Sequence, residues 1–184
     1  MRDLDSDKPS IAPRSSFAPA RDSTQREYIA FGLGDDLYAL PLSSVREIMT
    51  VQPLTEVPRA PRTVLGIFSV RGGVTTLIDT RRCLGLPSVS LTPRARVLLV
   101  DIGNELIGML VDRVEQVHRL AQDEIEPASA IGGDLAEYVV GIGRPGTHTE
   151  EREGHHVRRP AYAQTTSSEH DILILLDPIS LLKE

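Results

Sequence analysis

The stretch EYIAFGLGDDLYALPLSSVREI, residues 27–48, decides the fold because the chain repeats its plan in RVLLVDIGNELIGMLVDRVEQV, residues 96–117. Each copy starts with alternating apolar side chains, passes through a Gly-containing polar turn, and returns in a second apolar run. Alternation over so few residues is typical of β-strands buried on one face, so each copy predicts a hairpin. The copies are offset by about 68–69 residues. The chain therefore predicts two related, β-rich units.

The repeat continues beyond these hairpins. VLGIFSV (64–70) has its counterpart in VVGIGR (139–144), and TTLIDTRRCL (75–84) has one in ILILLDPISLL (172–182). The offset is larger here because the segment 144–170 interrupts the second copy. Short barrels that are closed or nearly closed bury such strands without exposing their edges.

The predicted fold class is therefore mainly β, with one unit at about 26–90 and the other at about 94–183. Exchange of terminal segments between the two barrels is compatible with this plan. Residues 1–25 are rich in Pro, Ser, Asp and Arg and have no hydrophobic period, so a disordered tail is expected. The segment 144–170 has balanced charge and four histidines, which is typical of a flexible loop at a hairpin tip.

The composition argues against several classes of function. A net charge of −6 and an aromatic content of 4% disfavour nucleic-acid binding. The single cysteine, Cys83, excludes an internal disulfide and fits a reducing compartment. No apolar run approaches the roughly 18 residues that cross a bilayer, and the N-terminus does not have the layout of a signal peptide. We expect a cytoplasmic protein without membrane insertion.

Local patterns predict the elements between the strands. Ser44 is followed three residues later by Glu47, which is a capping-box pattern, so a short helix is expected there. Gly72–Gly73 is expected to supply positive φ in a tight or bulged hairpin turn. A helical turn is expected within TRRCLGLP (80–87). Carboxylates at the ends of predicted strands are expected to cap turns or helices: Asp79, Asp101, Asp112 and Asp177.

No residue pattern indicates catalysis. The segment 71–73 is not a phosphate loop, because a strand follows its glycines where a helix N-terminus would be needed. Arg71 is then either a structural hydrogen-bonding residue or a surface contact, and spacing does not separate these roles. Cys83 is expected to be a buried or half-buried thiol, and His118 to lie at the surface. The histidines of 144–170 lack the rigid support that a metal site needs, and no catalytic triad or HExxH motif occurs.

The ordered motifs F-x-L-G-D-x-x-Y, V-x-E-I, V-x-G-x-x-x-V-R-G, I-D-x-R and V-D-x-V resemble those of CheW-type chemotaxis coupling proteins. The resemblance runs from about residue 26 to 183, with 144–170 outside it. It implies two SH3-like five-stranded β-barrels with short helices around a shared core, no enzymatic activity and no cofactor. Such proteins bridge the cytoplasmic tips of methyl-accepting chemoreceptors to the regulatory domain of a CheA-type histidine kinase, itself a similar double barrel. An adaptor that is monomeric alone and assembled in arrays is implied.

The resemblance also implies partner-binding residues. The receptor-facing positions are those of the V-x-E-I motif and of the following hairpin: Val45, Glu47, Ile48, Gly66 and Arg71. The kinase contact is implied at the barrel ends, with Ile131 as one anchor. An apolar groove suits a helical receptor tip, and a charged pair at its rim fixes register more than it adds affinity.

The sequence departs from the family pattern at three positions. Ser69 stands where the family usually has Asn, Thr76 where it has Pro, and Thr80 where it has Leu. These departures and the 144–170 segment leave open a coupling protein of another signalling cluster, serving motility or development. A small-ligand or metal-sensing module that uses the His-rich segment is the remaining alternative.

Overall fold

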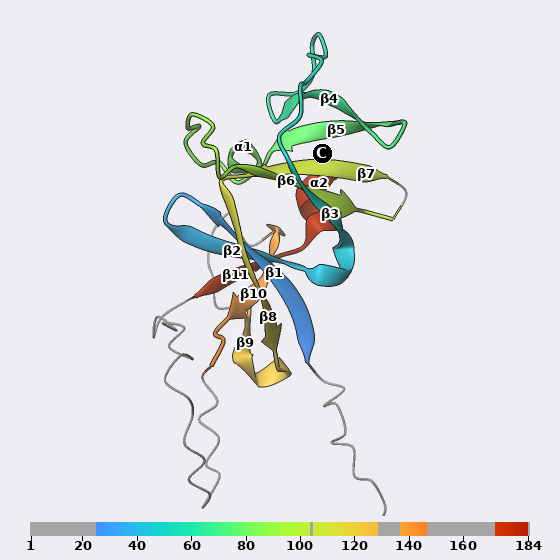
Figure 1. Ribbon diagram of the computed structural model, residues 1–184. Coiled ribbons are helices and arrows are strands. Elements are labelled where there is room, and N and C mark those ends of the chain that lie inside the picture. The colour runs from blue at the N-terminus through green and yellow to red at the C-terminus, as the bar shows by residue number, and fades with distance from the viewer. Residues whose placement is uncertain (1–24, 104, 129–136, 147–171, 184) are drawn as a thin grey trace, which may run out of the picture.

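The structure is a computed structural model that describes residues 25–103, 105–128, 137–146 and 172–183 (Figure 1). Predictions for residues 1–24, for Ile131 and for most of 144–170 lie outside the described residues. The described chain forms a six-stranded and a five-stranded sheet with only short helices, which confirms the predicted mainly β fold class.

The two sheets share one chain in an interleaved order. The six-stranded sheet contains, from edge to edge, β8 (Arg113–Leu120), β1 (Arg26–Leu33), β2 (Asp36–Pro41), β11 (Leu173–Leu176), β10 (Val139–Gly143) and β9 (Ile125–Pro127). The five-stranded sheet contains β3 (Val45–Thr50), β6 (Arg96–Asp101), β7 (Leu106–Val111), β5 (Gly73–Asp79) and β4 (Val64–Val70). Short helices lie at the connections: η1 (Leu42–Ser44), α1 (Thr80–Cys83), η2 (Gln122–Glu124) and α2 (Pro178–Leu182). None of the helices in the described part of the chain is long and apolar enough to cross a membrane.

Each sheet combines strands from both copies of the repeat. The hairpin β1–β2 of the first copy lies beside β8, β11 and β10 of the second, whereas the hairpin β6–β7 lies beside β3, β5 and β4 of the first. In both sheets the second hairpin strand has a parallel neighbour, β11 on β2 and β5 on β7. The hairpins are thus exchanged between the sheets. The ranges 26–90 and 94–183 describe the repeat in sequence and not the sheets.

The largest apolar cluster takes side chains from both sheets. Phe31 and Leu40 enter it from β1 and β2, and Leu98 and Met109 enter it from β6 and β7, all without measurable exposure. Leu181 of α2 packs into the same cluster. Burial of apolar surface contributes about 25 cal/mol per Å², so this shared aliphatic interior is the main source of adhesion between the sheets.

The five-stranded sheet closes on itself along one edge. Thr55, which follows β3, donates its backbone N–H to the carbonyl of Ile67 in β4 at 2.8 Å, and the reverse bond measures 2.9 Å. This contact brings together the two edges of the sheet. Closure removes exposed edges, which is how small β-barrels avoid unwanted pairing.

The helix predicted after Ser44 is wrong. The short helix η1 ends at Ser44, whose hydroxyl donates to the carbonyl of Pro41 at 2.7 Å and caps nothing. Residues Val45–Thr50 form β3 instead, with alternating exposure and a ladder to β6. A capping box is a local preference, and the cross-strand pairing of β3 outweighs it.

The hairpin turn between β4 and β5 is displaced by one residue from its prediction. The residues with positive φ are Arg71 (48°) and Gly72 (86°), and Gly73 is the first residue of β5. Val70 pairs directly with Gly73, so the turn has two residues, both left-handed, as in a type I′ hairpin.

The predicted end caps are confirmed. The Asp79 carboxylate accepts the backbone N–H of Arg82 at the start of α1. The Asp177 carboxylate accepts those of Ile179 and Ser180 at the start of α2. Both side chains use N–H groups that a helix leaves unpaired in its first turn.

Candidate protein-binding surface

Arg71 and Glu47 meet at one end of the five-stranded sheet. The left-handed turn presents Arg71, whose Nη2 donates to Glu47 Oε2 at 2.8 Å. The Arg71 side chain is 81% exposed, so Arg71 lies at the surface while also bonding Glu47. The pair joins β3 to the β4–β5 hairpin. Exposed ion pairs of this kind stabilise a fold by only about 0–1 kcal/mol, so its position matters more than its energy.

A second ion pair lies beside the first because β3 contains a bulge. The register against β6 shifts between Val45 and Glu47, so Arg46 is the extra residue. Arg46 Nε donates to Asp101 Oδ2 at 3.0 Å, and Asp101 Oδ1 accepts the backbone N–H of Gly103 at 2.7 Å. The bond from Arg46, followed by that from Gly103, lowers the pKa of the Asp101 carboxyl. The bulge allows two consecutive residues of β3 to reach the same hollow.

Apolar side chains lie between the two ion pairs. A hollow of about 660 Å³ opens here, formed by β3, the β4–β5 hairpin, β6 and β7. We call it the barrel mouth and define it by its two ion pairs and its apolar residues: Arg46, Glu47, Val70, Arg71, Val74, Leu99, Asp101 and Leu106. Val74 is 73% exposed and Leu106 is 39% exposed. Apolar centres with charged margins are typical of protein-binding surfaces.

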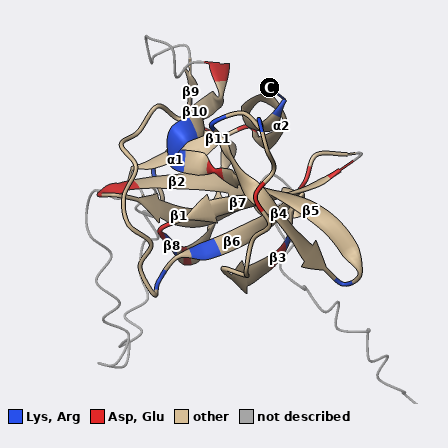
Figure 2. Cartoon of the chain, turned by 90° about the horizontal axis from the view of Figure 1, so that it is seen from above, with Lys and Arg blue, Asp and Glu red and all other residues tan. Residues whose placement is uncertain are grey.

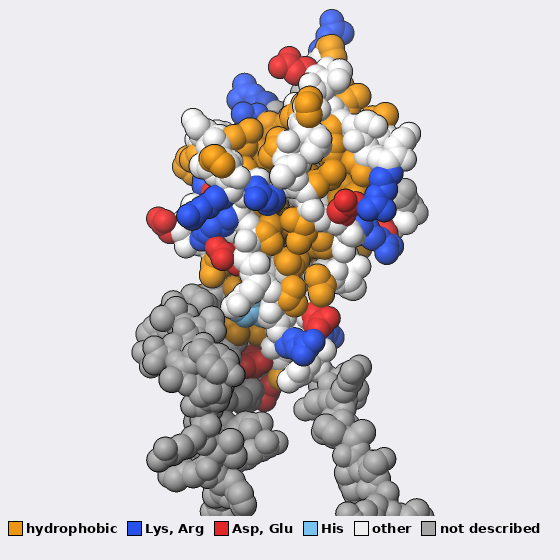
Figure 3. Space-filling model, in the orientation of Figure 1, with side chains coloured by type: hydrophobic (Ala, Val, Ile, Leu, Met, Phe, Trp, Pro, Cys, Tyr) orange, Lys and Arg blue, Asp and Glu red, His pale blue; other side chains and the backbone are white. Residues whose placement is uncertain are grey.

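The wider surface agrees with this description. Figure 3 shows hydrophobic side chains gathered over the half of the molecule that holds the five-stranded sheet, with charged side chains mainly at the margins. Figure 2 shows acidic and basic residues of the described chain on several elements around the molecule.

The remaining residues implied by the resemblance lie elsewhere. Val45, at the start of β3, packs partly buried against the large apolar cluster. Ile48 is 44% exposed but does not line the barrel mouth. Gly66 lies in β4 against the backbone of Thr55. The structure thus brings only Glu47 and Arg71 together in the mouth, while Ile131 is outside the described residues.

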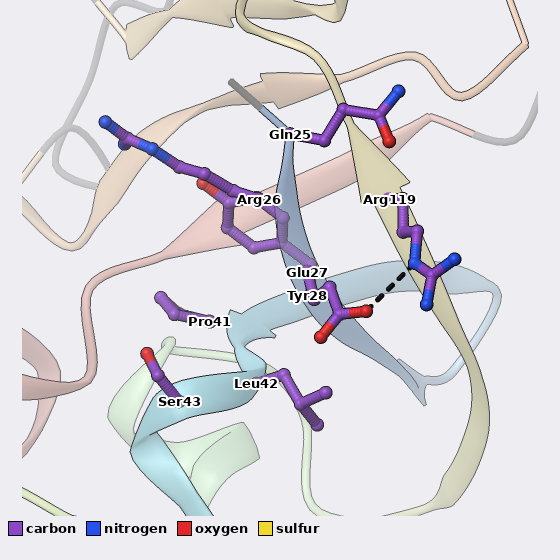
Figure 4. Close-up of a pocket in the computed structure, with 8 residues that line it drawn as sticks. All are labelled: Gln25, Arg26, Glu27, Tyr28, Pro41, Leu42, Ser43 and Arg119. Atoms are coloured by element: carbon purple, nitrogen blue, oxygen red, sulfur yellow. Dashed lines mark hydrogen bonds and ion pairs between the residues drawn. The ribbon is translucent and has the colours of Figure 1, made fainter. Parts of the chain in front are cut away.

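A larger hollow, of about 980 Å³, lies between the start of β1, η1 and the end of β8. Glu27 accepts a bond from Arg119 Nε at 2.9 Å across it. Figure 4 shows Arg26 and Arg119 extending to opposite sides of this hollow, so their charges do not converge on one point. None of the residues implied by the resemblance lines it.

The described residues contain no group of three or more potential metal ligands. Cys83 is partly buried against the large apolar cluster, which confirms the expected half-buried thiol. His118 is half-buried on β8. The histidines of 144–170 lie outside the described residues.

Of the eight residues that define the barrel mouth, the sequence predicts only Glu47 and Arg71 as partner-binding residues. Arg46 cannot be identified from the motif, which its neighbours Val45 and Glu47 carry, and a bulge has no reliable signature in a single sequence. The patterns at Val74 and Leu106 predict strands but not which side chains are exposed. The one available signal was that Val74 follows the hairpin turn almost directly, where side chains are seldom covered.

The chain is similar to known proteins of one family. The model of the CheW-like domain family matches residues 27–184. Similar curated proteins include a probable chemotaxis protein CheW of Rhizobium etli, 34% identical over 60% of this chain and 71% of that protein. The chemotaxis protein CheW of Helicobacter pylori is 33% identical over 64% and 72%, and protein FrzA of Myxococcus xanthus is 28% identical over 72% and 82%.

A solved structure agrees with the fold. The crystal structure of the scaffolding protein TtCheW from Thermoanaerobacter tengcongensis superposes with a TM-score of 0.69 at 21% identity, covering 86% of this chain and 93% of that one. At this identity the match concerns the fold alone.

Proposed function

Because the chain belongs to the CheW-like domain family, we propose that it is a non-enzymatic adaptor in chemotaxis or a related motility pathway. In this role it couples methyl-accepting chemoreceptors to the regulatory domain of a CheA-type histidine kinase. It acts in the cytoplasm at receptor arrays and has no turnover of its own.

The observation that carries the proposal is the barrel mouth. Its centre exposes Val74 and Leu106, and its margins hold two ion pairs whose charges remain accessible to a partner. Apolar contact supplies affinity at such a surface, whereas rim charges select the partner and fix register. The exposed apolar centre and the charged margins support a role of the mouth in recognition.

The residues implied for receptor binding retain distinct roles in this proposal. Glu47 and Arg71 contact the partner directly at the mouth, and Ile48 adds an exposed apolar side chain on β3. Val45 and Gly66 act through the shape of β3 and β4, because both pack against the protein itself. The kinase contact is proposed at a barrel end, apart from these receptor-facing residues, with Ile131 as one anchor.

A charge at the centre of the mouth tests the proposal. Val74→Asp is expected to weaken binding of a kinase regulatory domain or of a receptor tip fragment at least about tenfold, because an exposed apolar contact becomes a desolvated carboxylate. Each partner is titrated separately by calorimetry, which also tells the two assignments apart. The matched control is Val140→Asp, since Val140 of β10 is 49% exposed on the other sheet. Unchanged binding of both partners by Val74→Asp would rule out the mouth as the docking surface.

Charge reversal shows whether the partner contacts the ion pair. Glu47→Arg and Arg71→Glu are each expected to weaken binding, and the double reversal restores the pair within the chain. If the partner contacts these charges, its binding to the double variant stays weak. Full restoration by the double variant would show that the pair only supports the local structure.

A further inference from the structure

The described chain passes between the sheets at two places. One is η1, between β2 and β3, and the other is the single residue Asp112, between β7 and β8. Two covalent links define an axis about which the sheets can rotate. Burial of the shared apolar cluster opposes separation of the sheets, but the hydrophobic effect itself has no preferred direction. Hydrogen bonds do have one, so directional contacts near a link are suited to fixing the angle.

Asp112 receives hydrogen bonds from both sheets. Its carboxylate accepts a bidentate contact from Arg81, with Nε at 2.9 Å, and Arg81 lies on α1 directly after β5. The same carboxylate accepts the backbone N–H of Gly34 at 2.7 Å, in the turn between β1 and β2. The backbone N–H of Asp112 donates to the carbonyl of Gly32 at 3.2 Å. One residue thus ties a helix of the five-stranded sheet to a turn of the six-stranded sheet.

We propose that Arg81 and Asp112 form a clasp that sets the angle between the two sheets, whereas the apolar core supplies their adhesion. The Arg81 side chain is only 12% exposed, and its Nη1 also donates to the carbonyl of Pro87 at 3.0 Å. A bidentate guanidinium–carboxylate contact constrains orientation as well as distance. Ion pairs shielded in this way add little net stability compared with apolar packing but are suited to specifying one arrangement.

Arg113 holds the same turn from its other side. Arg113 Nη1 donates to the carbonyl of Gly34 at 2.6 Å, while Asp112 holds the N–H of that residue. The Arg113 guanidinium lies over Gly32 so closely that a Cβ there would be 2.2 Å from its Cζ. A side chain at position 32 would therefore displace the Arg113 guanidinium from this position.

The clasp does not depend on the proposed function, since it concerns only the angle between the two sheets. For any partner that contacts both sheets, a fixed angle presets the geometry of the complex and reduces the entropy lost on binding.

Pulsed electron paramagnetic resonance between the sheets tests the clasp. Spin labels are attached to cysteines at two exposed positions, Ser69 in β4 and Val140 in β10, with Cys83→Ala in every protein. The variant Arg81→Met/Asp112→Asn removes both charges and keeps similar volumes. It is expected to remain folded by circular dichroism and to give a label-to-label distance distribution at least about twofold broader than the parent.

The matched control is Arg46→Met/Asp101→Asn, which removes an ion pair of the same kind within one sheet and is expected to leave the distribution narrow. A folded Arg81→Met/Asp112→Asn protein with the parental distribution would overturn the proposal. Failure of that variant to fold would also overturn it, because the ion pair would then supply adhesion. Arg81→Lys keeps the charge without the fork and is expected to broaden the distribution to an intermediate width; a parental width would count against the clasp.

Discussion

Thr80 buries a hydroxyl that has no hydrogen-bond partner among the described residues. It is the first residue of α1, has no measurable exposure, and stands where the family pattern has Leu. A buried hydroxyl without a partner costs about 1–3 kcal/mol. Thr80→Val keeps the shape of the side chain and is expected to raise the free energy of unfolding by about 1 kcal/mol.

Urea titration measures the effect of Thr80→Val as a shift of the unfolding midpoint. The control is Ser180→Ala, since the Ser180 hydroxyl donates to Asp177 at 2.6 Å and its loss is expected to lower the midpoint. A lower midpoint for Thr80→Val would show that its hydroxyl does find a partner.

Gly66 lies where the five-stranded sheet closes through the Thr55–Ile67 bridge, and the backbone there leaves no room for a side chain. Its φ is 151°, and a Cβ at this position would lie 2.7 Å from the carbonyl oxygen of Thr55. Gly66→Ala is expected to lower the free energy of unfolding by about 1–3 kcal/mol, because either the strained backbone or the Thr55–Ile67 bridge must give way. Gly73→Ala is the control, since its nearest neighbour would be the Val70 carbonyl at 3.5 Å. Equal unfolding midpoints for the two variants in urea would contradict this account.

At the residue scale, the sequence predicts Glu47 and Arg71 as partner-binding residues but does not predict the side chains around them. The resemblance assigned both residues to a partner surface, and the structure joins them directly. It placed Gly66 in the same set, although the structure shows a local steric reason for glycine there. Residue type alone does not separate these two reasons, because a glycine required by local sterics and a glycine at a partner contact look the same in a sequence.

At the scale of elements, α2 depends on its cap. The helix has only five residues, yet it carries Leu181 into the large apolar cluster. Asp177→Ala is expected to lower the free energy of unfolding by about 1 kcal/mol, because the N–H groups of Ile179 and Ser180 lose their acceptor. Thermal unfolding of the full chain checks this. Asp177→Asn retains an acceptor and is expected to stay close to the parent, so equal losses in both variants would point to the charge instead.

Local sequence patterns predict the strands of the hairpins and the helix caps, but they predict a helix where the structure has β3. VREIMT alternates in exposure because one face of β3 packs on the interior through Val45 and Met49. Locally, however, Ser44 and Glu47 resemble a helix start. The segment in β8 has the same place in the second copy of the repeat and is also a strand. Pairing partners that are far away in sequence decide such segments, which is why local signals misassigned the first of them.

At the scale of the whole molecule, stability depends on pH through Asp112. Hydrogen bonds from Arg81 and then from the Gly34 N–H lower the pKa of the Asp112 carboxyl below its unfolded value, which is about 3.9. This contribution is therefore fully present above that unfolded value and is lost as the pH falls through the folded pKa.

The midpoints of urea unfolding, measured between pH 7 and pH 2.5, test the direction of this pH dependence. Asp112→Asn is expected to be less stable than the parent at pH 7, and the difference is expected to shrink as the pH falls, because the parent carboxyl becomes neutral as well. Parallel curves would show that Asp112 acts through its shape and not through its charge.

The sequence by itself determined that this protein is built from two related β-rich units with an aliphatic core. Alternation, turn residues and the repeat are short-range features of the chain, and they survive any arrangement of the strands. Only the tertiary structure decided that the hairpins β1–β2 and β6–β7 exchange sheets, that a bulge in β3 aims Arg46 and Glu47 into one mouth, and that Asp112 joins the sheets. These features depend on register and on contacts between segments tens of residues apart. Their energies come from pairing and packing, which no local pattern encodes.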